Sequence, residues 1–175
     1  MQKVNIIIGR FQPFTYGHLK CIQNIYQEKH LKTIILMIDT INPTTKNPYK
    51  SSLLLPIYNE ALKAYKEIEG IILIKNANII TISEELNKQG YQVSSWVCGT
   101  DRYESYKRMS KNYHEQANLS EDFTITEIKR TSDDISATEA RRLIKEDDIQ
   151  GFSKITPLKR YYNILRNTLL NENLQ

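Results

Sequence analysis

Apolar and polar residues follow two periods along this chain, one typical of strands and one typical of helices. Five short apolar runs predict strands, at residues 4–8, 33–38, 71–74, 92–98 and 123–128. The run at 33–38 is almost continuously apolar, which indicates a strand covered on both faces. Apolar residues at helical spacing predict helices at 19–29, 51–67, 78–89, 103–113, 136–146 and from Thr156-Pro157 to about residue 170.

The alternation of strands and helices predicts the fold class. It favours one Rossmann-like α/β domain over residues 1–175, with a mostly parallel five-stranded sheet, right-handed crossovers and a C-terminal helix. No repeat, low-complexity tract or linker divides the chain. Ligands of such sheets bind at the carboxyl ends of the strands. The segments that begin at Gly9, Asp39 and Gly99, and the segment before Ser136, are therefore expected to meet at one edge.

Several helix boundaries have sequence signals. Pro56 interrupts the 51–67 pattern, and two placements remain open: Pro56 lies in the first turn, or a short separate turn precedes the helix. Gly70 and Gly90 are each expected to end a helix. Ser136 and Glu139 have the spacing of a capping box, so Ser136 is expected to be an N-cap.

The bulk composition excludes several partners. Hydrophobic residues are 40% and charged residues 25% of the chain, and the formal net charge is +4. Because the basic residues are dispersed and no apolar run has the length of a membrane span, we expect neither nucleic acid nor a membrane as a partner. Without a secretory leader or metal spacing, Cys21 and Cys98 are expected to be reduced thiols of a cytoplasmic protein. His30 and His114 are expected at the surface.

The stretch from Gly9 to His18 lies between the first strand and the first helix. A glycine-marked loop before a helix N-terminus offers backbone N–H groups and a positive helix end, which suit a phosphate. Arg10 adds a fixed cation and His18 an imidazole. The stretch is neither a GxGxxG fingerprint nor a P-loop. The alternative is a plain strand-to-helix turn with a surface arginine.

The same stretch resembles a known family. Thr15-Tyr16-Gly17-His18 is similar to the (T/H)xGH signature of the nucleotidylyltransferase superfamily. Gly9-Arg10-Phe11-Gln12-Pro13-Phe14 is most similar to archaeal-type nicotinamide mononucleotide adenylyltransferases. The resemblance implies a nucleotidyltransferase domain in which Thr15 and His18 contact the nucleotide phosphates.

A second segment, residues 135–141, resembles the ISxTxxR element of the same superfamily. Two hydroxyls, from Ser136 and Thr138, and Arg141 one turn into a helix can bind the β- and γ-phosphates. The alternative is an ordinary capped helix with two solvated arginines, Arg141 and Arg142.

A third match, Gly99-Thr100-Asp101-Arg102, resembles the Gly-Ser/Thr-Asp sequence that follows the fourth strand in several relatives. These residues are expected to form a loop near the nucleotide, or a helix-opening turn with Asp101 as its cap. Trp96 lies on the preceding strand, where core packing is favoured over base stacking. The expected ATP-binding residues are Gly9, Arg10, Phe11, Thr15, His18, Gly99, Asp101, Ser136, Thr138 and Arg141.

One region departs from the archaeal-type pattern. Asn47-Pro48-Tyr49 keeps the Asn-Pro-aromatic sequence, but the Glu-Arg that follows it in these relatives is missing. Lys46, Lys50 or Arg102 can replace that phosphate-binding arginine, or the second substrate differs. The residues expected to bind the second substrate are Asp39, Lys46, Trp96 and Arg102.

The resemblance implies transfer of the adenylyl group of ATP to nicotinamide mononucleotide, forming NAD and pyrophosphate. The expected catalytic residues are His18, Thr15, Arg10 and Arg141, with Mg²⁺ held mainly by the nucleotide and water. Three alternatives remain open: another adenylyl- or cytidylyltransferase acting on phosphopantetheine or a polyol phosphate, a non-enzymatic nucleotide sensor, and a basic nucleic-acid-binding protein. Relatives are commonly oligomeric, so a homo-oligomer is an expectation.

Overall fold

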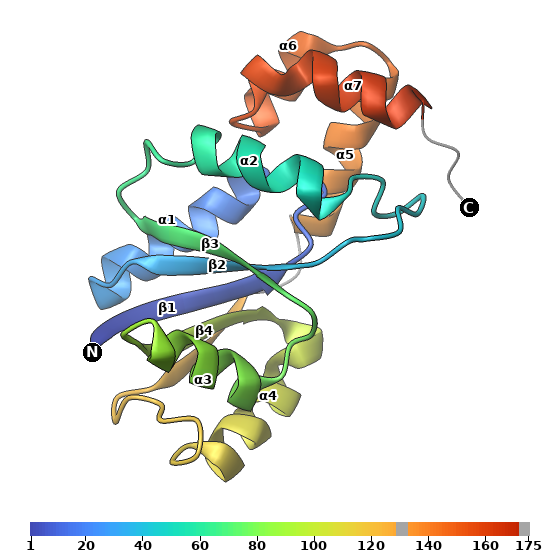
Figure 1. Ribbon diagram of the computed structural model, residues 1–175. Helices are drawn as coiled ribbons and strands as arrows, with labels where there is room; N and C mark the ends of the chain where they lie inside the picture. Colours follow the sequence, from blue (N-terminus) through green and yellow to red (C-terminus); the bar gives the residue numbers. More distant parts are fainter. Residues whose placement is uncertain (129–132, 172–175) are drawn as a thin grey trace.

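Five parallel strands form the sheet at the centre of the molecule (Figure 1). The computed structural model describes residues 1–128 and 133–171, with side chains described from residue 137 onward in the second range. In sheet order the strands are β3 (Ile68–Ile74), β2 (Thr33–Ile38), β1 (Gln2–Gly9), β4 (Tyr91–Gly99) and β5 (Thr124–Ile128). Every neighbouring pair runs parallel, so the predicted α/β fold with a parallel five-stranded sheet is confirmed.

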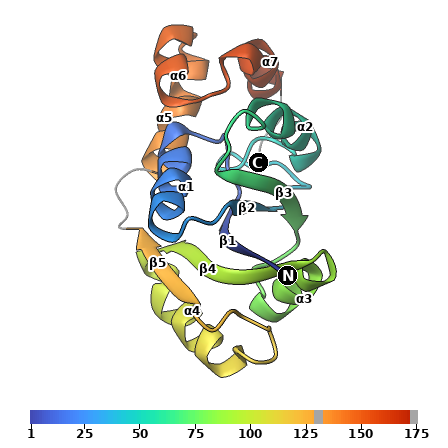
Figure 2. The ribbon, with the colours of Figure 1, turned by 90° about the vertical axis from the view of Figure 1, so that its left-hand side faces the viewer.

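Helices cover both faces of this sheet (Figure 2). They are α1 (Tyr16–Lys29), α2 (Ser51–Ala61), α3 (Ile79–Lys88), α4 (Thr100–Tyr113), α5 (Asp133–Lys145), α6 (Ile149–Ile155) and α7 (Tyr162–Asn171), with a 3₁₀ turn at Lys159–Tyr161. On β2, Ile35 and Met37 pack toward α1, α2 and α5 to α7, whereas Ile34 and Leu36 pack toward α3 and α4. Strand β2 is therefore covered on both faces, as its continuous apolar run predicts. Within the described residues, no helix is long and apolar enough to cross a bilayer.

Helix α2 differs from its prediction at both Pro56 and its end. Pro56 lies inside the helix, in its second turn, so neither predicted placement is correct. The helix ends at Ala61 rather than near residue 67, and Leu62 caps it in an ordinary right-handed conformation. Gly70 lies within β3 and does not end the helix. No glycine or proline marks the true end, so the sequence carries no signal for it.

The starts of several helices also differ from prediction, and α1 begins at Tyr16, three residues before the predicted start. Helix α4 begins at Thr100 directly after β4, so Gly99 is its N-cap and residues 100–102 form its first turn rather than a loop. Helix α5 begins at Asp133, so Ser136 lies inside it and is not its N-cap. Helix α6 was not predicted, and Thr156 follows it instead of opening the last helix. Gly90, with a φ of 88°, does follow α3 as predicted.

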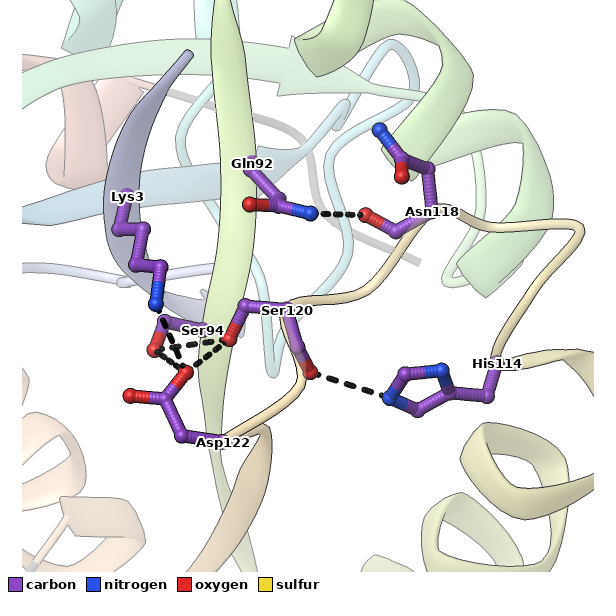
Figure 3. Close-up of polar contacts among 7 residues, drawn as sticks. All are labelled: Lys3, Gln92, Ser94, His114, Asn118, Ser120 and Asp122. Carbon is purple, nitrogen blue, oxygen red and sulfur yellow. Dashed lines mark hydrogen bonds and ion pairs between the residues drawn. The ribbon is translucent and has the colours of Figure 1, made fainter.

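A polar network fixes the segment between α4 and β5 against the amino-end side of the sheet (Figure 3). Asp122 accepts hydrogen bonds from Ser120 and, at 3.2 Å, from Lys3 of β1. Ser120 also lies 3.2 Å from the hydroxyl of Ser94 on β4. His114 is half-buried rather than at the surface, because its Nε2 donates to the Ser120 carbonyl at 3.0 Å. This network holds the edge strand β5 beside β4 and lies away from the carboxyl ends of the strands.

Candidate active site

A cavity of about 520 Å³ opens at the carboxyl ends of β1 and β4. These are the neighbouring strands at which the chain order in the sheet reverses, the usual ligand position in parallel sheets. Its walls come from the ends of β1, β2, β4 and β5, the loops after β1 and β2, the starts of α1 and α4, and the second and third turns of α5. Arg141 thus lies further into its helix than the one turn that was expected. The predicted site residues on the wall are Gly9, Arg10, Phe11, His18, Lys46, Gly99, Asp101, Arg102, Thr138 and Arg141.

The loop after β1 turns sharply at Phe11. Phe11 has a φ of 52°, and its ring is buried against Gly9, Phe14 and His18. A Cβ added at Gly9 would lie only 3.2 Å from the Phe11 ring, so a larger residue there would have to displace that ring. The hydroxyl of Tyr58 bonds both ends of the turn, donating to the Phe11 carbonyl at 2.5 Å and accepting from Phe14 N at 2.9 Å. The loop is thereby held in one shape by the core.

Thr15 and His18 form the capping box at the start of α1. The Thr15 side chain accepts from the backbone N–H of His18 at 3.5 Å, and the Thr15 backbone N–H donates to His18 Nδ1 at 3.0 Å. Because Nδ1 is an acceptor in this pair, the proton of the neutral ring is on Nε2. Only 8% of His18 is exposed, and it lines the cavity.

Two arginines approach the cavity from different elements. Arg10 Nη1 donates to Thr40 Oγ1 at 3.1 Å and to the Asp39 carbonyl at 3.3 Å. Arg141 Nη1 donates to the Gln12 carbonyl at 2.6 Å, and its Nη2 lies 3.4 Å from Thr138 Oγ1. The next residue, Arg142, binds Glu139 and Glu146 on the exposed side of α5. Glu139 therefore forms an ion pair with Arg142 inside α5, in place of the capping-box role that its spacing from Ser136 predicted.

The loop after β2 is closed at its base and carries two polar residues to the cavity wall. Thr40 N donates to Ser51 Oγ at 2.6 Å, and Ser51 N donates back to the Thr40 carbonyl at 3.1 Å. Between these residues, Lys46 and Asn47 line the cavity. Lys50, the third candidate for the missing arginine, is exposed at the N-cap of α2 and does not line the cavity.

Three of the described site residues that were predicted are not on the cavity wall, and a fourth predicted residue lies outside the described side chains. Thr15 is fully buried behind His18. Asp39 contributes its backbone carbonyl to Arg10, and its side chain does not line the cavity. Trp96 is fully buried and stacks on Tyr106 of α4, with ring centroids 4.4 Å apart, which is the core packing that its place on a strand favoured. The side chain of Ser136 lies outside the described residues.

Sequence comparison assigns the family. Residues 6–143 match the family model described as cytidylyltransferase-like. The chain belongs to this family. It is therefore a nucleotidyltransferase, and the superfamily that the Thr15-to-His18 motif resembles is confirmed. No curated protein matches the chain by sequence.

Several solved structures share the fold of this chain. A nicotinic acid mononucleotide adenylyltransferase from Plasmodium falciparum, complexed with APC, is 15% identical, with a TM-score of 0.61 over 98% of this chain and 99% of its own. The bifunctional NMN adenylyltransferase/ADP ribose pyrophosphatase from Francisella tularensis is 21% identical, with a TM-score of 0.63 over 98% of this chain and 51% of its own. This cytidylyltransferase-like chain thus spans about half of the Francisella protein. TmcAL from Thermotoga maritima, bound with alpha-thio ATP, is 14% identical, with a TM-score of 0.54 over 97% of this chain and 56% of its own.

Positive charge dominates the described wall of the cavity in this member of the cytidylyltransferase-like family. Arg10, Lys46, Arg102 and Arg141 line it, against one carboxylate among the described lining residues, Asp101. Such a wall favours an anionic ligand. Cys98 also lines the cavity, but burial of its thiol, with the nearby carboxylates of Glu127 and Asp101, raises the pKa of that thiol to about 11. Cys98 is therefore protonated at neutral pH and unsuited to act as a nucleophile.

Gln12 and Asn47 line the cavity but were not among the predicted site residues. Gln12 is 4% exposed, and its side chain bonds to the backbone of Tyr49. Gln12 could not be predicted as a site residue from the sequence, because a glutamine in a loop is usually exposed to solvent and belongs to no catalytic pattern. Asn47 is marked in the sequence only as part of the Asn-Pro-aromatic pattern. Proximity to the cavity is visible only in the folded chain.

Proposed function

We propose that the protein transfers the adenylyl group of ATP to nicotinamide mononucleotide, forming NAD and releasing pyrophosphate. One observation carries the proposal: Arg10, His18 and Arg141, from two segments far apart in the sequence, line one cavity at the carboxyl edge of a parallel sheet. A cavity of about 520 Å³ is of the size that small-molecule ligands occupy. Membership of a nucleotidyltransferase family supports the reaction type.

In this proposal the triphosphate lies between the loop after β1 and the second and third turns of α5. His18 donates from Nε2 to the α-phosphate and the bridging oxygen. Arg10 and Arg141 bind the β- and γ-phosphates, with Thr138 beside Arg141. The predicted direct role of Thr15 changes, because its backbone N–H and hydroxyl already contact His18. Thr15 therefore orients the imidazole.

The reaction needs no protein nucleophile. A phosphate oxygen of the acceptor forms a bond to the α-phosphorus as the bond from that phosphorus to the β-phosphate oxygen breaks. A phosphate monoester is already anionic at neutral pH, since its second pKa is about 6. The protein must instead align two repelling anions and neutralise the charge that develops on pyrophosphate. The cationic wall and the His18 donor fit these two tasks.

Magnesium is proposed to enter with the nucleotide. Within the described residues, no group of three or more His, Cys, Asp or Glu side chains could hold a metal ion. Asp101 on the cavity wall can supply one carboxylate ligand. This donor set fits Mg²⁺, which usually keeps several waters and binds one or two carboxylates together with substrate phosphates. When bound, Mg²⁺ supplies further charge neutralisation on the phosphate oxygens.

The acceptor is proposed from two lines of support. The sequence from Gly9 to Phe14 is most similar to that of archaeal-type nicotinamide mononucleotide adenylyltransferases. Two structures with this fold are named for adenylyl transfer to NMN or its nicotinic acid counterpart. In place of the missing arginine, Lys46 and Arg102 are the cations on the wall that would bind the acceptor phosphate. Both are exposed, as an entering substrate requires.

A screen of pyrophosphate release tests the proposal. ATP and CTP are each combined with nicotinamide mononucleotide, phosphopantetheine and polyol phosphates, with Mg²⁺ present. We expect release with ATP and nicotinamide mononucleotide, and NAD as the second product. Release with another acceptor or with CTP would replace this substrate assignment. Nucleotide binding without release from any pair would favour the non-enzymatic sensor.

A further inference from the structure

Gln12 lies where three segments of the candidate site meet. Its side chain reaches the loop after β2, its backbone reaches α5, and the residue itself belongs to the loop after β1. It is buried, with 4% of its surface exposed. A buried side chain amide must form hydrogen bonds in place of those it loses from water. The partners of Gln12 therefore show what it holds in place.

The amide of Gln12 pairs with the backbone of Tyr49 on both sides. Nε2 donates to the Tyr49 carbonyl at 2.8 Å, and Oε1 accepts from the Tyr49 N–H at 2.9 Å. This arrangement fixes which way the amide points, because a flipped amide would place oxygen against oxygen. Tyr49 is fully buried, and its hydroxyl donates to the Leu165 carbonyl of α7 at 3.2 Å. Gln12 is thus bound to a fixed point in the core.

The backbone of Gln12 holds one arginine, and its side chain contacts the residue that holds the other. The Gln12 carbonyl accepts from Arg141 Nη1 at 2.6 Å. Its Nε2 also lies 3.5 Å from Thr40 Oγ1, the atom that accepts from Arg10 Nη1 at 3.1 Å. Both arginines proposed to bind the β- and γ-phosphates are therefore linked to Gln12.

The loop that carries Lys46 depends on the same amide. Thr40 lies before the loop and Tyr49 near its end, and Gln12 contacts both. Movement of Gln12 would consequently shift the acceptor side of the cavity together with the two arginines. Because both polar ends of the Gln12 amide are occupied by Tyr49, the side chain is engaged in holding the protein rather than substrate.

We propose that Gln12 is a positioning residue that sets Arg10, Arg141 and the Lys46 loop in one relative geometry for nucleotidyl transfer. The inference rests on the proposed function for the reaction that it serves. Misplacing a binding group by about 1 Å can cost about a hundredfold in rate even when the chemistry is untouched. Loss of the amide is expected to act on this scale.

Two substitutions of Gln12 test the proposal. Gln12→Glu keeps the shape but cannot donate from Nε2 to the Tyr49 carbonyl, and Gln12→Met removes both hydrogen bonds at similar volume. The matched control is Asn5→Asp. Asn5 is fully buried, its Nδ2 donates to the Leu31 carbonyl at 2.7 Å, and it does not line the cavity. The control thus removes the same kind of buried amide bond away from the site.

The measurements are the Kd of ATP by calorimetry and kcat and KM by pyrophosphate release, at a temperature where circular dichroism shows each variant folded. We expect kcat/KM of both Gln12 variants to fall about a hundredfold, with weaker ATP binding and a raised KM for the acceptor. Asn5→Asp is expected to lower the melting temperature and leave kcat/KM unchanged. Gln12 variants that match Asn5→Asp in ATP affinity and in kcat/KM per folded molecule would overturn the positioning role.

The two proposals fail in different ways. If the wild-type protein binds ATP but converts no acceptor, the proposed function fails, and the effect of Gln12 is still decided by the Kd of ATP. If the wild-type protein is active and only the Gln12 variants are indistinguishable from the control, the positioning role fails while the proposed function stands. If the wild-type protein binds no ATP, both are overturned.

Discussion

The backbone N–H of Thr15 donates to Nδ1 of His18 at 3.0 Å, which fixes both the orientation and the tautomer of the imidazole. In a capping box this position usually holds Glu or Gln, whose side chain accepts the same hydrogen bond. The imidazole of His18 therefore has two functions: it completes the capping box of α1, and it forms part of the cavity wall.

His18→Glu separates these two functions. Glutamate can keep the capping box by accepting from the Thr15 N–H, so we expect little change in melting temperature. Because a carboxylate has no hydrogen to donate, loss of the Nε2 donor is expected to lower kcat by about a hundredfold or more, the usual cost of removing one donor to a transition-state charge. The control is His30→Glu, since His30 is exposed at the end of α1 and outside the cavity wall. An unchanged kcat in His18→Glu would contradict the proposed contact.

Arg141→Lys is expected to raise the KM for ATP and lower kcat, by about tenfold or more in kcat/KM. An ammonium group cannot match the planar fork with which Arg141 bonds the Gln12 carbonyl and, as proposed, phosphate. The adjacent Arg142→Lys is a matched control, because Arg142 binds Glu139 and Glu146 on the exposed side of the same helix. Steady-state pyrophosphate release measures both. Equal losses in the two variants would argue against Arg141 as the phosphate ligand.

Lys46→Ala and Arg102→Ala are expected to raise the KM for the acceptor by about tenfold each, the effect of about 1.4 kcal/mol, and to leave the KM for ATP unchanged. Each removes a cation proposed to bind the acceptor phosphate. Lys50→Ala is the control, since Lys50 is exposed and does not line the cavity. Initial rates with one substrate varied and the other saturating separate the two constants. A rise in the KM for ATP instead would assign these cations to the nucleotide.

The free energy of unfolding is expected to depend on pH because of Asp122. Hydrogen bonds from Ser120 and then Lys3 lower its pKa from 3.8 to about 2. A carboxyl whose pKa is lower in the folded state stabilises the fold while it is ionised. Its contribution is therefore complete above the unfolded pKa and disappears as the pH falls from about 4 toward 2.

Urea unfolding at pH 7 and near pH 2 tests this dependence. Asp122→Asn is expected to unfold at a lower urea concentration than the wild-type protein at pH 7, and the difference is expected to shrink near pH 2. Glu121→Gln controls for the loss of one negative charge at the neighbouring position. A difference that stays the same at both pH values would show that ionisation of Asp122 does not contribute.

The sequence predicted the sheet well because its signals are local. The apolar run at 33–38 coincides with β2, and residues 4–8 lie within β1. Strand order also predicted that the Gly9 loop and the segment before Ser136 meet at one edge of the sheet, and the family resemblance added Arg141. Arg10, His18 and Arg141 all line the cavity at this edge. Such signals need only the residue types and their order.

Helix boundaries and contacts between segments were harder to predict. Helix α6 has only seven residues and contains Gly151, so it is too short to show a clear helical spacing of apolar residues. Its N-terminus is stabilised by Asp148, whose side chain accepts from the Gly151 N–H. Pro56 is accommodated in the second turn of α2, where a proline usually disfavours a helix. The pairing of Gln12 with Tyr49 joins residues far apart in the chain, and no spacing rule reports it.

The mutual hydrogen bonds of Thr40 and Ser51 have a consequence for how such enzymes diversify. They tie the two ends of the 41–50 loop together, so residues between them can be inserted, deleted or exchanged while the ends keep their places. The nucleotide side, built on β1 and α5, would not be disturbed. Exchanging the residues at the tip of this loop, with Gln12 and Tyr49 retained, is therefore expected to change which acceptor the enzyme uses while the nucleotide side of the cavity keeps its structure.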